Sequence, residues 1–170
     1  MVVLVAAQSL AAALVAAQVG WRPALAGSLV AVFSGIWLAA VDLRTHRLPI
    51  YAVYAATASV LLLLVLAALA GQDPQRALAV CAGAGALRLV YQVVSFGIGG
   101  IGAGDVRLSG LLGAVGAWTG WHGWVLTMVL PFVAFAMVGA VVNAVRRQRG
   151  GPLPFGPAMA LGLLAVVVAG

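Results

Sequence analysis

Long apolar stretches separated by short polar breaks run along the whole chain. Arg22 and Pro23 interrupt the first apolar run, and Gln72, Asp73 and Pro74 separate the third run from the fourth. A helix that crosses a lipid bilayer needs about 20 predominantly apolar residues, within a range of about 17–25. The last predicted helix is the shortest of the set. The predicted helices cover residues 2–20, 24–41, 50–70, 77–95, 105–120, 124–145 and 157–170.

This pattern predicts an all-α fold, a polytopic transmembrane helix bundle of about six to seven spans in one membrane-embedded domain over residues 1–170. The composition agrees, because 65% of the residues are hydrophobic and only 7% are charged. Soluble domains have roughly a quarter of their residues charged. The lone cysteine, Cys81, excludes an internal disulfide and a cysteine-based zinc site. It is expected to be buried in helix packing.

The basic residues are distributed unevenly between the two sides of the predicted bundle. All nine are arginines, and the net charge is +6. Because cytoplasmic loops of membrane proteins carry the excess of basic residues, this charge indicates topology rather than nucleic-acid binding. The arginine-rich side is predicted to face the cytoplasm, with the N-terminus inside and the C-terminus outside. That side holds Arg44, Arg47, Arg107, Arg146, Arg147 and Arg149, and the opposite side holds Arg22 and Arg76.

Two of the three acidic residues lie at the cytoplasmic edge of this topology. They are Asp42 and Asp105, whereas Asp73 lies at the opposite edge and is interpreted as a turn residue. A carboxylate at membrane depth suggests a functional site. Two carboxyl groups at short range share a proton, so one can activate a water molecule while the other polarises a carbonyl group. His46 and His122 fall on opposite sides, so no metal site and no cofactor are expected.

Small residues accompany both aspartates. Ser109, Gly113, Gly116 and Gly120 follow Asp105 near one predicted helical face, and Gly35 and Ala31 lie at compatible offsets before Asp42. The two helices that carry the aspartates are therefore expected to pack closely against each other. Small residues allow membrane helices to approach closely, so this stripe indicates packing and turns the Asp105 face inward. Five of the eight residues in 97–104 are glycine, which suggests a hinge or a substrate-docking edge before Asp105.

Three segments resemble, in the same order, motifs of the type IV prepilin peptidases, which are membrane aspartic proteases of the GxGD class. The segment from Asp42 to Pro49 resembles the first aspartate motif. Gly102-Ala103-Gly104-Asp105-Val106-Arg107-Leu108 resembles the GxGDxKL motif, with Arg107 at the lysine position. Pro154-Phe155-Gly156-Pro157 is similar to the C-terminal segment of the family. The resemblance covers nearly the whole chain.

The resemblance implies an aspartic endopeptidase that removes the leader of prepilin-like substrates, type IV pilins or pseudopilins, at the cytoplasmic face of the inner membrane. It implies Asp42 and Asp105 as the catalytic pair. Arg44 stands where many members have a second acid, and Ile50 where they often have a polar residue. The expected partners are the substrate proteins and the lipid bilayer, and no nucleic acid. Residues expected to bind substrate or support the site are Gly102, Gly104, Arg107, Pro49, Pro154, Phe155 and Gly156.

The larger bacterial members carry a cytoplasmic domain with paired CxxC motifs that methylates the new N-terminus. With its single cysteine, this chain resembles a short form without that domain. An alternative function from another class is a small proton-coupled transporter that uses Asp42 and Asp105 as a relay. A transporter favours acids spread through the membrane depth, whereas these two lie at one edge. A structural subunit of a pilus platform would explain the hydrophobicity but would leave both carboxylates without a role.

Overall fold

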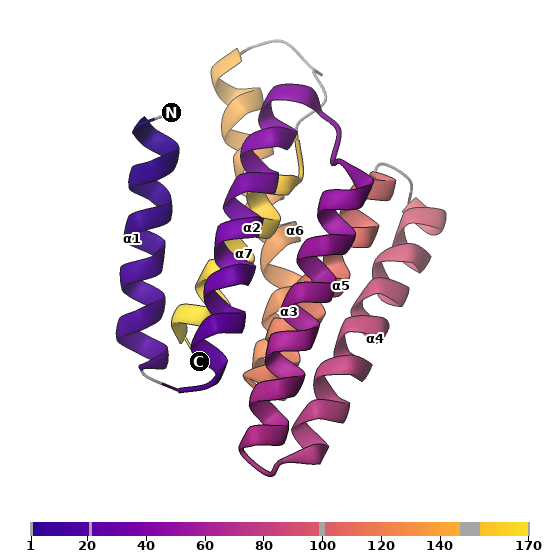
Figure 1. The fold of residues 1–170 in the computed structure, drawn as a ribbon. Helices are drawn as coiled ribbons and strands as arrows, with labels where there is room; N and C mark the ends of the chain where they lie inside the picture. Colours follow the sequence, from indigo (N-terminus) through magenta and orange to yellow (C-terminus); the bar gives the residue numbers. More distant parts are fainter. Residues whose placement is uncertain (1, 21, 99–100, 147–153, 170) are drawn as a thin grey trace.

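The computed structural model describes residues 2–20, 22–98, 101–146 and 154–169. Within these residues the chain forms seven α-helices, and successive helices run in opposite directions through one bundle (Figure 1). The helices are α1 (Val2–Val19), α2 (Ala24–Thr45), α3 (Ile50–Ala70), α4 (Pro74–Ile98), α5 (Ala103–Trp118), α6 (Trp121–Arg146) and α7 (Gly156–Ala169).

The predicted all-α bundle is confirmed, and every helix boundary agrees with its prediction within four residues. The largest difference is at the end of α2, which was predicted at residue 41 and lies at Thr45. The helix ends where His46 adopts a left-handed conformation with φ of 50°, three residues before Pro49. Asp42 therefore lies inside the last turn of α2 rather than in the loop that follows it.

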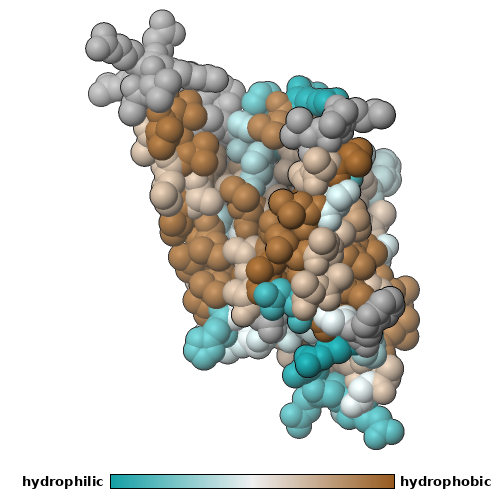
Figure 2. All heavy atoms as spheres, turned by 90° about the vertical axis from the view of Figure 1, so that its left-hand side faces the viewer, coloured by the Kyte–Doolittle hydropathy of each residue, from teal (hydrophilic) through white to brown (hydrophobic). Residues whose placement is uncertain are grey.

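Four helices, α2, α3, α4 and α6, are long and apolar enough to cross a membrane, and α1 and α7 are shorter apolar helices. The surface agrees with this assignment. On the face drawn in Figure 2, hydrophobic side chains cover the middle of the molecule and hydrophilic ones gather toward its two ends. The chain is therefore a multi-pass membrane protein.

Helix α5 forms the centre of the bundle. It contacts α4, α6, α3 and α7, with a smaller contact to α2. Every residue from Leu108 to Gly116 is buried, as are Asp105 and Val106. A helix enclosed by other helices does not need the apolar length of a lipid-facing span. This explains how a helix of 16 residues that carries Asp105 and Arg107 is accommodated.

The glycines of α5 do allow close packing, but not against α2. A Cβ atom at Gly113 would overlap the carbonyl oxygen of Gly83 in α4, and one at Gly116 would lie 2.8 Å from the Cα atom of Trp124 in α6. The indole of Trp124 also donates a hydrogen bond of 3.0 Å to the carbonyl of Gly83. The stripe thus brings α4 and α6 against α5, and the Asp105 side of α5 is buried in consequence.

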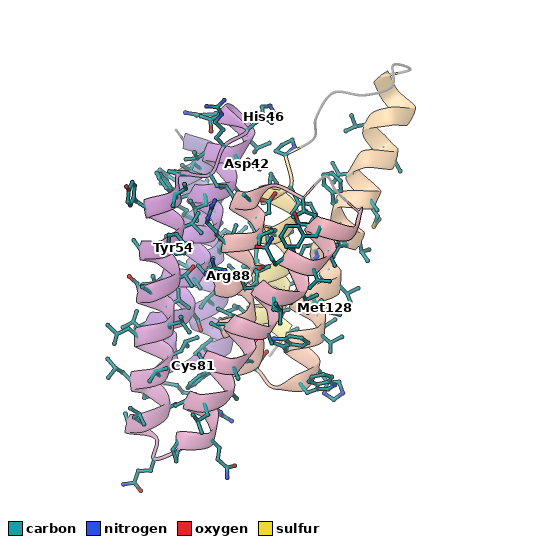
Figure 3. All side chains as sticks on the ribbon, turned by 90° about the vertical axis from the view of Figure 1, so that its right-hand side faces the viewer. Asp42, His46, Tyr54, Cys81, Arg88 and Met128 are labelled. Atoms are coloured by element: carbon teal, nitrogen blue, oxygen red, sulfur yellow. The ribbon has the colours of Figure 1, made fainter. Side chains whose placement is uncertain are left out.

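The predicted burial of Cys81 is wrong. Cys81 lies on the exposed side of α4 (Figure 3). In a membrane protein, an apolar residue on such a surface faces lipid rather than a neighbouring helix. The apolar character of a thiol suits either environment, so the sequence around Cys81 could not distinguish them.

Candidate functional site

The alternating helix directions bring the three motif segments to one end of the bundle. The end of α2 with Asp42, the start of α5 with Asp105 and the start of α7 with Gly156 all lie there. In Figure 3, Asp42 and His46 are labelled at this end and Cys81 lies far from it. We call this the dyad end, after Asp42 and Asp105.

Asp42 projects from α2 toward α7 and is only 7% exposed. The backbone N–H of Gly156 donates a hydrogen bond of 2.9 Å to its Oδ2 atom. A Cβ atom at Gly156 would lie 2.8 Å from that same oxygen, so the contact requires glycine. The backbone of Asp42 is held as well, because its carbonyl accepts a hydrogen bond of 2.8 Å from the N–H of His46. The carboxylate of Asp42 is therefore held by the Gly156 amide, and its backbone is held by the end of α2.

Asp105 is the third residue of α5 and is 9% exposed. Its side chain folds back over Gly102, the extended residue that caps the helix, and lies within reach of the Gly102 backbone. A Cβ atom at Gly102 would lie 3.0 Å from Oδ2 of Asp105. This is the acidic half of a capping box, and an acid in the first turn also suits the helix dipole. The same interactions that start α5 thus orient its carboxylate.

The two carboxyl groups interact. Helices α2 and α5 are in contact, and a negative charge on Asp42 acts on the carboxyl group of Asp105. The turn that follows Asp42 also contacts α5, because a Cβ atom at Gly104 would lie 2.8 Å from the Cβ atom of Leu48. Leu48 precedes Pro49, whose extended conformation caps α3. Gly104 of the second aspartate motif therefore allows the turn of the first motif, at Leu48, to pack closely on α5.

An aromatic cluster holds the segment before α7 in place. Phe155 is buried, and its ring centroid lies 5.5 Å from that of Phe132, 5.1 Å from that of Phe135 and 6.4 Å from that of Tyr91. Because Phe155 directly precedes Gly156, these contacts fix the amide that binds Asp42. Pro154 next to it is partly buried.

The sequence pattern assigns no role to Tyr91, and it does not encode which backbone amides reach the aspartates. Tyr91 is 0% exposed, and its hydroxyl has no hydrogen-bond partner among the residues that the structure describes. The available signal was a phenol inside a predicted apolar span. The N–H of Gly156 left no signal, because every residue except proline carries one.

Arg107, another predicted site residue, reaches toward α3. Arg107 lies within hydrogen-bonding reach of the Tyr54 hydroxyl, on the side of the bundle where Arg88 bonds the same hydroxyl at 3.3 Å. Figure 3 shows Tyr54 and Arg88 together on that side. The predicted hinge can be followed only in part, since residues 99–100 lie outside the described residues. The predicted cytoplasmic arginines at positions 147 and 149 also lie outside them.

Two further features of the described residues are the distribution of side chains that can bind metals and a cavity. Within 2–20, 22–98, 101–146 and 154–169, no three histidine, cysteine or acidic side chains cluster as metal ligands do. A cavity of about 430 Å³ opens at the opposite end of the bundle, lined in part by Arg22, Asp73 and Arg76. The buried aspartates do not line this cavity.

Comparison with protein families gives a match over residues 29–142, to the Type IV leader peptidase family. The matched range includes Asp42 and Asp105. The chain belongs to this family. It is an aspartic-type leader peptidase with multiple membrane helices. Comparisons with curated proteins and with solved structures give no match. Gly156 lies outside the matched residues, so its contact with Asp42 is a finding of the structure alone.

Proposed function

We propose that Asp42 and Asp105 form the catalytic pair of this leader peptidase, and that it removes the leader of prepilin-like substrates at the cytoplasmic face of the inner membrane. One observation carries the proposal: two carboxyl groups from different helices, α2 and α5, are buried at the same end of the bundle. Neither forms an ion pair with a basic side chain among the described residues. Buried acids without basic partners are expensive to keep in a fold, which favours a functional explanation.

The chemistry follows from a pair that holds one proton. The ionised carboxylate takes a proton from a water molecule, whose oxygen attacks the carbonyl carbon of the scissile peptide bond. The protonated carboxyl group gives its proton to the carbonyl oxygen, and a tetrahedral diol forms. When the carbon–nitrogen bond breaks, the amine takes a proton from one carboxyl group and a diol hydroxyl returns one to the other. The pair ends with one proton, as it began.

Backbone amides give this pair fixed positions. The N–H of Gly156 on Asp42 and the backbone of Gly102 on Asp105 hold the carboxyl groups without introducing a positive side chain. A lysine or arginine in either place would favour the doubly ionised pair, which has no proton to give. Neutral donors leave the shared proton available.

The buried state of both aspartates supports an opening step before cleavage. A peptide substrate must reach carboxyl groups that are 7% and 9% exposed. The glycine-rich segment that joins α4 to α5 is our candidate hinge, because glycine permits backbone conformations closed to other residues. Catalytic contacts often tighten only in the substrate complex, so the closed free site is compatible with this order of events.

The direct test is cleavage by the purified protein. The protein is reconstituted in proteoliposomes with a prepilin-like substrate, and the product is followed by mobility and by sequencing of the new N-terminus. A leader-sized shift with a single new N-terminus supports the proposal. Proton flux through the liposomes without any cleavage would instead support the transporter.

The cytoplasmic face is tested separately by cysteine labelling. In a Cys81→Ala background, one variant carries His46→Cys at the dyad end and the other carries Gln72→Cys at the opposite end. A membrane-impermeant maleimide applied to intact cells should label only the Gln72 variant. Labelling of the His46 variant alone would place the dyad end outside.

A further inference from the structure

We propose that the hydroxyl of Tyr91 is a third catalytic group of this site, which donates a hydrogen bond to the carbonyl oxygen of the scissile peptide bond. The inference rests on the proposed function of Asp42 and Asp105. It goes beyond that function by assigning to α4 a residue that touches the substrate.

The packing of α4 against α5 sets the position of Tyr91. The two helices run in opposite directions and are in close contact where Gly83 meets Gly113. Tyr91 lies eight residues after Gly83, and Asp105 lies eight residues before Gly113. At a rise of 1.5 Å per residue, both side chains are about 12 Å from that contact, measured toward the same end. This register brings Tyr91 level with Asp105, and the charge of Asp105 acts on the Tyr91 phenol.

The other side of the ring faces the segment that holds Asp42. The Tyr91 ring packs on Phe132 with a centroid distance of 5.1 Å and meets the edge of Phe155 at 6.4 Å. Phe155 is followed by Gly156, whose N–H is bonded to Asp42. Tyr91 therefore touches the element that fixes one aspartate and lies beside the helix start that fixes the other.

The unpaired hydroxyl is the observation that points to a ligand. Tyr91 is 0% exposed, and its hydroxyl has no hydrogen-bond partner in the described part of the chain. A buried polar group without a partner destabilises a fold, and phenylalanine would fill the same volume without that penalty. The hydroxyl is explained if its acceptor arrives with the substrate.

The substrate supplies such an acceptor next to the pair. As water attacks, negative charge develops on the carbonyl oxygen, and a donor already in place stabilises that charge. Tyr91 keeps its proton throughout, so the proton transfers between the aspartates, the water and the peptide are unchanged. The hydroxyl contributes a hydrogen bond that is stronger in the transition state than in the bound substrate.

The test is Tyr91→Phe in reconstituted protein, with wild-type cleavage as the reference. Loss of a single oxyanion donor reduces kcat by about 10²-fold to 10³-fold, and we expect a loss on the order of 10²-fold. KM and the pH profile should stay unchanged, and the thermal midpoint should equal or exceed that of the wild type. Tyr51→Phe is the matched control, because Tyr51 is 90% exposed on α3 and its hydroxyl should not affect kcat.

Three outcomes would overturn the assignment. They are a kcat within twofold of the wild type, a loss of activity that parallels a lower thermal midpoint, and a shifted pH profile, which would mean that Tyr91 acts through an aspartate. If Tyr91→Phe does not fold, a ring-fluorinated tyrosine at position 91 decides, because it keeps the hydroxyl and changes its acidity. An unchanged kcat would then refute the assignment. A wild-type protein that cleaves nothing would instead refute the proposed function.

Discussion

The two ends of the bundle use the same side chain in different ways. At the end opposite the dyad, Asp73 has a 43% exposed side chain, caps α4 through a hydrogen bond of 2.9 Å from the N–H of Arg76, and pairs with the Arg76 guanidinium at 3.4 Å. At the dyad end, Asp42 and Asp105 are buried and receive only backbone donors among the described residues. An exposed carboxylate with a basic partner is explained by local structure, whereas two buried ones without such a partner are not.

The three aspartates also differ in whether they stabilise the helix end at which they lie. Asp73 stands directly before Pro74, so its helix starts with the preferred combination of an acidic cap and a proline. Asp105 also stabilises a helix start, through Gly102. Asp42 does neither, since it lies in the last turn of α2, where the helix dipole disfavours an anion. Of the three aspartates, Asp42 is the one whose position helix formation explains least.

The largest expected effect separates the two ends directly. Asp42→Asn and Asp105→Asn should each reduce the rate of leader cleavage by about 10²-fold to 10⁴-fold, because each removes one role of an acid–base pair. Asp73→Asn should cleave at close to the wild-type rate. Initial rates are measured on proteoliposomes that contain matched amounts of inserted protein. If either the Asp42 or the Asp105 variant cleaves at the wild-type rate, that aspartate has no part in the mechanism.

A second prediction concerns the backbone donor to Asp42. Gly156→Ala places a Cβ atom 2.8 Å from Oδ2 of Asp42, so either the carboxylate or the start of α7 must move. Since misplacement of a catalytic group by about 1 Å can reduce the rate by about 10²-fold, we expect a loss of about 10-fold to 10²-fold in kcat.

The matched control for this change is Gly85→Ala. A Cβ atom at Gly85 meets nothing within 4 Å, and this glycine also lies in a helix. Its rate should match the wild type. Equal rates for the Gly156 and Gly85 variants would show that the hydrogen bond to Asp42 is dispensable.

The sequence predicts the helices of this bundle better than it predicts the contacts at the site. Helix positions follow from apolar runs and from breaks at Pro23, Pro49 and Pro74, so they were predicted within a few residues. The shared end of the two aspartates followed from the alternation of spans. The contact from Gly156 to Asp42 joins residues 114 positions apart through a backbone N–H, and no side-chain pattern encodes such a bond. The bond exists only in the packed structure.

The direction in which side chains point was the least predictable feature. In a soluble protein, polarity distinguishes the outside of a helix from the inside, but lipid accepts the same apolar residues as the core. The exposed Cys81 and the partners of the α5 glycines illustrate this. Asp105, by contrast, could be placed, because a carboxylate in an apolar helix has to face the bundle interior.

A third, smaller effect is expected where the two aspartate motifs touch. Gly104→Ala would bring a Cβ atom 2.8 Å from that of Leu48 and should displace the turn after Asp42 relative to α5. We expect a loss of about 10-fold in kcat, since the carboxyl groups would still be present but less well aligned.

Removing the Cβ atom at position 48 should relieve this clash. The double variant Gly104→Ala with Leu48→Gly should recover activity relative to Gly104→Ala alone, and a double-mutant cycle measures the coupling. Additive losses would mean that the two residues act independently, and the contact would then have no role in aligning the pair.

The smallest expected effect lies at the opposite end and tests the structural role of Asp73. Removal of an N-cap side chain costs about 1 kcal/mol of stability, and the exposed pair with Arg76 adds little to that. Asp73→Ala should therefore lower the free energy of unfolding by about 1 kcal/mol, whereas Asp73→Asn keeps a capping oxygen and should stay close to the wild type. Denaturation in detergent micelles measures both, and cleavage rates per folded molecule should be unchanged in each. A loss of cleavage by folded Asp73→Ala would mean that the two ends of the bundle are coupled, and that exposure and a basic partner do not suffice to assign an aspartate to structure alone.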